Sequence, residues 1–231
     1  MAKIAVVVYG PPGSGKTIQA DLLARALNLI HFDVGPFLTE IIYEPKKKNN
    51  RFIQAQRKIF EKGGLCDPRW VARLVAQRIQ KISRAGFGVV LSGSLRTMTE
   101  TFGGAKREKG LLSVFEKLYG RRDIIFFELL VSAETSLRRN RDRFVCEVCG
   151  RPVLTEFFRA RRCPLCGGKL KRRVLDSPAI IKERLREYRV LTQPVHKELE
   201  QRGYRIYRID GARAPFLTHA RILSRITRWR S

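Results

Sequence analysis

Short apolar runs alternate along the chain with longer segments in which apolar residues recur at helical spacing. The run Lys3–Tyr9 is continuous and rich in β-branched residues, which is typical of a parallel strand buried on both faces. Similar runs predict further strands at Leu29–Phe32, Phe87–Leu91, Asp123–Val131 and Tyr204–Ile209.

Segments of helical period lie between these strands. The best marked is Pro68–Arg84, because Asp67 can cap its N-terminus and Pro68 takes the first helical position. The other predicted helices are Lys16–Leu27, Phe37–Tyr43, Asn50–Glu61, Lys106–Leu118, one starting near Ala133, Ser177–Gln201 and one from about Pro215. The alternation and the length of 231 residues predict one α/β domain with inserts rather than two domains.

A glycine-rich segment follows the first strand. Residues Gly10–Thr17, GPPGSGKT, fit the pattern GxxxxGK[ST] between an apolar strand and an amphipathic helix, the context of a true P-loop. Backbone N–H groups there turn toward phosphate oxygens, Lys16 reaches the β- and γ-phosphates, and Thr17 can serve Mg²⁺. The segment predicts nucleoside triphosphate binding, which kinases, ATPases and GTPases share.

Four of the five cysteines form two CxxC pairs. Cys146 and Cys149 are separated by thirteen residues from Cys163 and Cys166, a pattern that closes a tetrahedral thiolate site around Zn²⁺. Four cysteine ligands leave no position for water, so we expect a structural zinc. Cys66 is left over, and we expect it to be a loop or half-buried thiol.

The chain is strongly basic, with 47 Lys and Arg against 21 Asp and Glu and a formal net charge of +26. Such a surface attracts polyanions, which include nucleotides, nucleic acid and acidic proteins. No apolar run approaches the roughly 20 residues of a membrane helix. We therefore expect a cytoplasmic protein with no membrane partner.

On these motifs the chain resembles the adenylate kinase family of nucleoside monophosphate (NMP) kinases, in the form with a zinc lid. The match runs from Lys3 to about Ile226. It includes GPPGSGKTIQA and Gly86–Thr97, which is similar to the family segment usually ending in Asp-Gly-Phe-Pro-Arg-Thr. The resemblance implies a P-loop NTPase-type parallel sheet flanked by helices, with a core (1–33, 64–138, 176–231), a helical acceptor-binding insert (34–63) and a zinc lid (139–175).

The resemblance also implies an activity: transfer of the γ-phosphoryl of ATP, with Mg²⁺, to an NMP, AMP first, by a monomer. Its implied catalytic residues are Lys16, Arg96, Arg139, Arg143, Arg173 and Arg184. The implied donor-binding residues are Gly10, Pro12, Gly13, Ser14, Gly15, Lys16, Thr17, Ile18, Arg139 and Arg213. The implied acceptor-binding residues are Val34, Gly35, Thr39, Gly93, Arg96, Glu100, Arg173 and Arg184. Arginines suit this task because phosphoryl transfer needs positioning and neutralisation of charge.

The sequence departs from the family at four places, one of which is the P-loop, where Thr17 follows Lys16 directly and Ile18 stands where the family usually has a threonine. Ser92 stands where the family usually has an aspartate that helps to hold hydrated Mg²⁺. Val34–Thr39 keeps only Gly35 of the usual acceptor motif, and Glu100 stands near the glutamine that reads adenine. The metal is therefore held differently or weakly, and an NMP other than AMP is a credible acceptor.

Two other interpretations stay open. A P-loop protein that has lost its acceptor site could use the zinc flap and the positive charge on nucleic-acid backbones. A kinase for a small molecule other than a nucleotide would also need the P-loop. Arg96 favours an acceptor phosphate, because it follows Ser92 and Gly93 at the end of a strand, where parallel sheets bind ligands.

Overall fold

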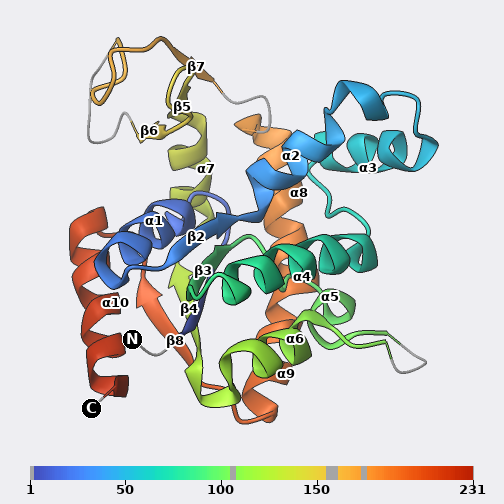
Figure 1. The fold of residues 1–231 in the computed structure, drawn as a ribbon. Helices are drawn as coiled ribbons and strands as arrows, with labels where there is room; N and C mark the ends of the chain where they lie inside the picture. The colour runs from blue at the N-terminus through green and yellow to red at the C-terminus, as the bar shows by residue number, and fades with distance from the viewer. Residues whose placement is uncertain (1–2, 105–107, 155–160, 173–175, 231) are drawn as a thin grey trace.

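Five parallel strands form the central sheet of the computed structural model, which describes residues 3–104, 108–154, 161–172 and 176–230 (Figure 1). The strand order is β2-β3-β1-β4-β8. Their bounds are β1 (Ala5–Tyr9), β2 (Ile30–Asp33), β3 (Val89–Ser92), β4 (Ile124–Leu130) and β8 (Ile206–Asp210). The central position of β1 places the segment that follows it in the middle of the carboxyl edge of the sheet, where ligands of such folds bind. The predicted P-loop α/β fold is confirmed.

Side chains of β1 alternate between two buried clusters. Val6 and Val8 pack with α1 (Lys16–Leu27) and α10 (Pro215–Arg230) on one face of the sheet. Val7 packs on the other face, which is covered by α4 (Pro68–Arg84), α6 (Leu111–Tyr119) and α9 (Gln193–Gln201). Burial on both faces explains why the strand is apolar throughout. None of the described helices combines the length and the apolar character needed to cross a membrane.

The segment between β2 and β3 is helical. It contains α2 (Val34–Ile42), a 3-10 turn (Pro45–Lys47), α3 (Arg51–Glu61) and α4. The predicted cap of α4 is confirmed, because the Asp67 carboxylate accepts a hydrogen bond from the N–H of Trp70 at 2.8 Å. Helix α2 begins at Val34, earlier than the predicted start at Phe37, because Asp33 caps it by accepting from the N–H of Gly35.

The segment between β3 and β4 differs from the prediction. A short helix, α5 (Met98–Phe102), precedes α6, and a 3-10 turn (Arg121–Asp123) leads into β4. Helix α6 begins at Leu111, not at Lys106 as predicted, and positions 106 and 107 lie outside the described residues. Gly110 allows the break, since its backbone lies against Thr101 and Gly103 with no room for a side chain.

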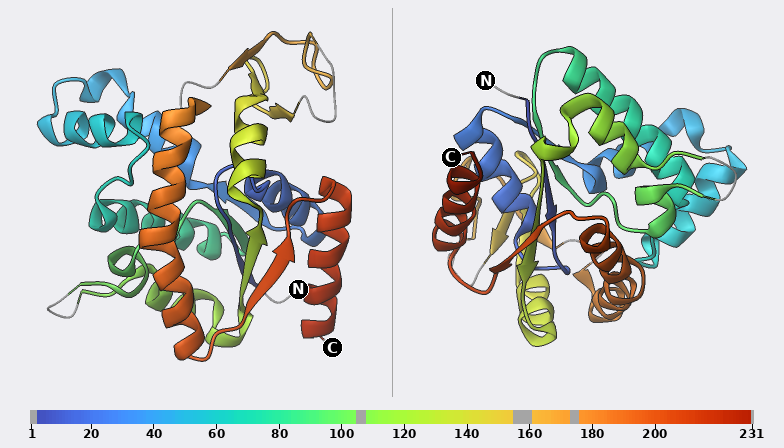
Figure 2. Two further views of the ribbon diagram at one scale, coloured as in Figure 1. Left: turned by 180° about the vertical axis from the view of Figure 1, so that it is seen from behind. Right: turned by 90° about the horizontal axis from the view of Figure 1, so that it is seen from below.

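The cysteine segment, which we predict to be a lid and call the lid below, lies beyond the carboxyl edge of the sheet (Figure 1). Helix α7 (Ala133–Arg141) leads into an antiparallel sheet of β5 (Arg143–Cys146), β6 (Pro152–Leu154) and β7 (Leu170–Arg172). Figures 1 and 2 show this lid and the α2–α3 pair projecting at the same end of the molecule. The chain returns through α8 (Pro178–Glu187), which a π-helical turn (Tyr188–Thr192) joins to α9 where one helix was predicted.

Candidate nucleotide-binding and phosphoryl-transfer site

Glycines give the loop after β1 its shape. Gly10, Gly13 and Gly15 have φ angles of 147°, 75° and 89°, which L side chains rarely adopt. A Cβ atom on Gly10 would lie 2.5 Å from Ser14 Oγ and 2.8 Å from the carbonyl oxygen of Leu129. The backbone therefore needs glycine at this position to curl as it does.

The first turn of α1 is open to an anion. Its N-cap, Gly15, offers no side-chain cap, and no acidic residue occupies the first turn. Ser14 Oγ is buried and has no hydrogen-bond partner among the described atoms. Unpaired N–H groups and the positive end of the helix dipole favour phosphate at such a terminus. The chemistry of the loop thus fits a nucleotide phosphate.

Lys16 has a backbone partner within the loop and a mainly positive electrostatic environment. Lys16 Nζ donates to the carbonyl oxygen of Pro11 at 2.7 Å. Burial of the amine, followed by the charges of Arg96 and Arg184, holds the pKa of Lys16 well below its ordinary value, while Asp33 acts in the opposite direction. A polyphosphate placed here would relieve this repulsion between cations.

A carboxylate lies at the open side of the loop. Thr17 Oγ1 donates to Asp33 Oδ2 at 2.9 Å, and Asp33 Oδ1 accepts from the N–H of Gly35 at 3.1 Å. Hydroxyl and carboxylate oxygens are donors of the kind that Mg²⁺ prefers, so these residues fit the ion that the family uses. We had not predicted a role for Asp33, although an acidic residue that ends a strand beside a P-loop was a usable signal.

Ser92 is engaged elsewhere. Its hydroxyl lies 3.0 Å from Nε2 of His31, and Ser92 itself is only 1% exposed. Burial lowers the pKa of His31, against the raising effect of Asp33 and Asp21. Position 92 therefore contributes a hydrogen bond between β2 and β3 and no charge.

Arg96 lies in a turn that a buried carboxylate organises. Glu100 accepts hydrogen bonds from Ser94 Oγ at 2.9 Å, from the N–H of Leu95 at 2.7 Å and from the N–H of Arg96 at 3.0 Å. Leu95 has a positive φ of 53°. Burial raises the pKa of Glu100 and lowers that of Arg96. Reading a base would require Glu100 to give up some of these bonds, so its assignment to the acceptor base stays a prediction.

Asp176 joins the two ends of the lid. It accepts from Arg143 Nε at 2.8 Å and also from Arg143 Nη2, while Arg184 Nη1 lies 3.9 Å from it. These arginines come from β5 and α8 and are thus brought together, and Arg143 also contributes to the field at Lys16. Arg173 lies outside the described residues.

Two predicted donor-site arginines meet at the loop after β8. Arg139 is buried and donates to the carbonyl oxygens of Gly211 at 2.6 Å and Ala212 at 2.7 Å. Arg213 pairs with Asp210 at 3.2 Å. Arg139 therefore ties this loop to α7 beside the P-loop, and a direct role of either arginine in binding the donor nucleotide stays a prediction.

Four of the predicted acceptor residues, Val34, Gly35, Thr39 and Gly93, lie in the first turns of α2 or directly after β3. Val34 is buried in the core, and Thr39 Oγ1 donates to the carbonyl oxygen of Gly35 at 2.9 Å. A Cβ atom on Gly93 would lie 3.9 Å from the N–H nitrogen of Gly35, so these glycines adjoin. Ile18, in the first turn of α1, is half-buried.

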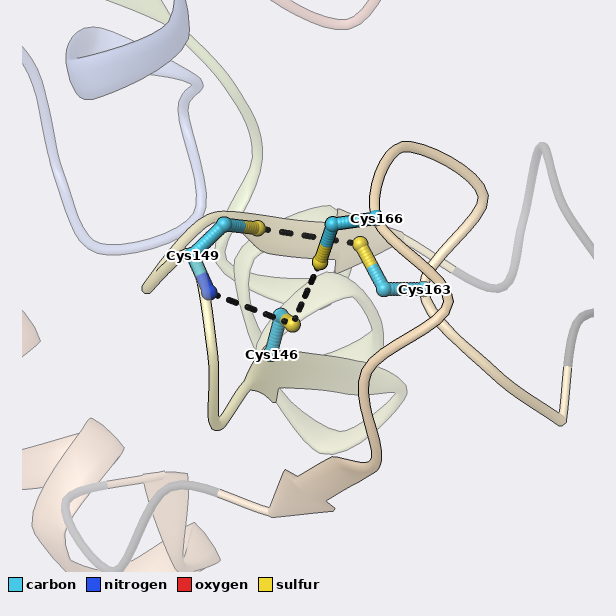
Figure 3. A group of neighbouring side chains, drawn as sticks. All are labelled: Cys146, Cys149, Cys163 and Cys166. Carbon is cyan, nitrogen blue, oxygen red and sulfur yellow. Dashed lines mark hydrogen bonds between the residues drawn. The ribbon is translucent and has the colours of Figure 1, made fainter.

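The four lid cysteines form one cluster (Figure 3). Their sulfur atoms lie within 4.8 Å of one another, with 3.4 Å between Cys146 and Cys166 and 3.7 Å between Cys149 and Cys163. Zn–S bonds of about 2.3 Å separate tetrahedral ligands by about 3.8 Å. The cluster therefore fits zinc. Cys66 is buried and lies apart, and burial raises its pKa to about 11.

The chain is similar to known proteins over most of its length. A family model described as an AAA domain matches residues 9–144. The chain is 30% identical to an adenylate kinase of Chlamydia pneumoniae over 82% of each protein. It is 26% identical to one of Petrotoga mobilis over 90% of each, and 29% identical to one of Methanothrix thermoacetophila over 90% of this chain and 91% of that protein.

A glycine cradle at the carboxyl edge of a parallel sheet, with the charges of Arg96, Arg184 and Arg143 acting on its lysine, fits a P-loop phosphotransferase. Together with these relatives, it shows that the chain belongs to the adenylate kinase family of nucleoside monophosphate kinases.

Proposed function

We propose that the protein transfers the γ-phosphoryl of Mg·ATP to AMP and so forms two molecules of ADP. The observation that carries this proposal is the glycine cradle of the P-loop, together with Arg143 and Arg184, which contact the same Asp176 carboxylate, and with the charges of Arg96, Arg184 and Arg143, which act on the amine of Lys16. These cations come from three separate parts of the chain, and the P-loop backbone provides a phosphate cradle beside them. The adenylate kinase relatives support AMP as the acceptor.

The proposed chemistry needs no protein nucleophile. Phosphoryl transfer depends on alignment of the two nucleotides and on neutralisation of the charge on the moving group. Lys16 and the N-terminus of α1 hold the donor phosphates, Arg96 holds the acceptor phosphate, and Arg143 and Arg184 reach the group in transit. Mg²⁺ supplies further neutralisation when it is bound.

The proposal gives each part of the fold a task. Residues 34–63, with α2 and α3, form the acceptor-binding insert, and residues 139–175 form the zinc lid over the donor. Lid closure excludes water, which would otherwise compete with the acceptor for the phosphoryl group. Asp176 pairs with Arg143 at one end of the lid and contacts Arg184 beyond the other end. In this proposal the two ends of the lid therefore move together.

An acceptor panel tests the proposal. Zinc-loaded protein is incubated with Mg·ATP and AMP, GMP, CMP, UMP or dTMP, and new diphosphates are separated by chromatography. We expect ADP from AMP at the highest rate. The Lys16→Ala variant should lose this activity, and Lys117→Ala, which removes an exposed lysine on α6, should keep it. If another NMP gives its diphosphate fastest, that NMP replaces AMP as the proposed acceptor. If no acceptor gives a diphosphate, the kinase assignment is overturned.

A further inference from the structure

The carboxylate that faces the P-loop lies on a different strand from the one where we expected it. Asp33 is the last residue of β2, and its Cα partner in the neighbouring strand β3 is Ser92. The family's usual aspartate would occupy position 92, but the serine there is buried and bonded to His31. Asp33 provides an acidic side chain on the neighbouring strand, at the same level of the carboxyl edge.

The contact between Thr17 and Asp33 prepares the hydroxyl for a cation. A hydroxyl group has one hydrogen to donate and two lone pairs. Thr17 Oγ1 donates its hydrogen to Asp33 Oδ2 at 2.9 Å, which leaves the lone pairs free for a metal. The other carboxylate oxygen is fixed by the N–H of Gly35, so the Asp33 side chain is held in this orientation without any metal.

Other acids near this edge are already paired. Asp176 binds Arg143, Asp210 binds Arg213, and Glu100 is used by its own turn. Within the described ranges, no lysine or arginine forms a salt bridge with Asp33. Its charge is thus available to a divalent ion beside the phosphates.

We propose that Asp33 replaces the missing strand-β3 aspartate and, with Thr17, holds the Mg²⁺ of the bound nucleoside triphosphate. This inference rests on the proposed function only in that the P-loop binds ATP, and it does not require that any acceptor be phosphorylated. Mg²⁺ in nucleotide sites keeps several waters and uses few protein ligands, so one hydroxyl and one carboxylate are enough as the ligands from the protein.

The Asp33→Asn variant separates metal binding from folding. Asparagine caps helices about as well as aspartate, and its side-chain oxygen can still accept from Gly35, so α2 should remain intact. The amide has no charge and binds Mg²⁺ poorly. Asp123→Asn is the matched control, because Asp123 immediately precedes β4, at the amino edge of the sheet and away from the P-loop.

The measurement is binding of Mn²⁺, a probe for Mg²⁺, to the protein–ATP complex by electron paramagnetic resonance, together with the affinity for metal-free ATP by calorimetry. Loss of a metal partner typically costs about 10- to 100-fold in metal affinity. We expect Asp33→Asn to weaken Mn²⁺ binding by such a factor while metal-free ATP binds as well as before or better, because a negative charge near the phosphates is gone. Asp123→Asn should change neither value.

The Thr17→Val variant completes the test, since it removes the hydroxyl and keeps the shape. Thr17→Val and the double variant should lose Mn²⁺ affinity to a similar extent as Asp33→Asn, because the two residues act on one ion. Mn²⁺ affinity of Asp33→Asn within twofold of the unchanged protein would overturn the inference. An equal loss of affinity for metal-free ATP would also overturn it, because Asp33 would then maintain the conformation of the loop rather than bind the metal. Failure of the proposed kinase activity would show in the acceptor panel and would leave these binding measurements unchanged.

Discussion

The carboxylate of Glu100 accepts a hydrogen bond at 3.0 Å from the backbone N–H of Arg96, the arginine proposed to bind the acceptor phosphate. The same carboxylate accepts from Leu95 and from Ser94, and Glu100 is 3% exposed. Glu100 thus holds the turn that presents Arg96.

Replacement of Glu100 by glutamine should weaken acceptor binding. Glutamine offers one acceptor oxygen in place of two and adds an NH₂ group next to backbone donors. An unsatisfied buried polar group costs about 1–3 kcal/mol, so we expect the KM for the acceptor to rise by about 10-fold with a smaller change in the affinity for ATP. Steady-state kinetics measure both, and Glu134→Gln on the exposed start of α7 is the control. Equal losses for donor and acceptor would contradict this positioning role.

ATP binding should be accompanied by proton uptake at Lys16. The pKa of this amine is lowered in the free protein by burial and by Arg96 and Arg184, and bound phosphates favour the charged form and raise it again. Between the two pKa values binding takes up a proton, and the affinity for ATP falls as pH rises through this window. Calorimetry in buffers of different ionisation enthalpy measures the proton uptake. The pH is kept above about 8, because phosphate groups with a second pKa of about 6 are then fully charged and take up no proton themselves.

The Lys16→Arg variant is the matched control for this experiment, because arginine stays protonated throughout the range. It should bind ATP without net proton uptake. Uptake of the same size in both proteins would show that the proton goes to another group.

The lid should depend on its metal. Structural zinc sites contribute folding free energy directly, so Cys146→Ser should lose zinc and unfold the small β5–β7 sheet. Protease cleavage within the basic lid should then accelerate, and phosphoryl transfer should slow, while the melting of the core changes little. Metal analysis and limited trypsin digestion measure the first two effects. Cys66→Ala, outside the cluster, should keep its zinc. Full zinc content in Cys146→Ser would contradict the four-cysteine site.

Features with a strong local pattern were predictable from the sequence. Strand β1, the P-loop and the paired cysteines follow from runs and spacings within a few residues, and each lies where it was predicted. The N-cap Asp67 belongs to the same class. These features depend on residues that are close together in the sequence, so they can be predicted without knowledge of the tertiary contacts.

Orientations set by distant contacts were not predictable. The carboxylate of Glu100 points into its own turn and that of Asp33 to Thr17, and neither direction follows from spacing along the chain. The π-helical turn at Tyr188–Thr192 is similar, since Tyr188 donates to the buried Glu128 of β4 at 2.7 Å. A helical pattern along the chain does not indicate that a side chain on a distant strand will accept this hydrogen bond.

The most direct test of the central claim is the phosphorus balance of one reaction. Phosphorus NMR follows the protein with Mg·ATP and AMP. The account predicts that ATP and AMP disappear together, that two ADP form for each AMP consumed, and that little inorganic phosphate appears, because the acceptor takes the phosphoryl group. Release of inorganic phosphate with AMP unchanged would contradict the account and define an ATPase instead.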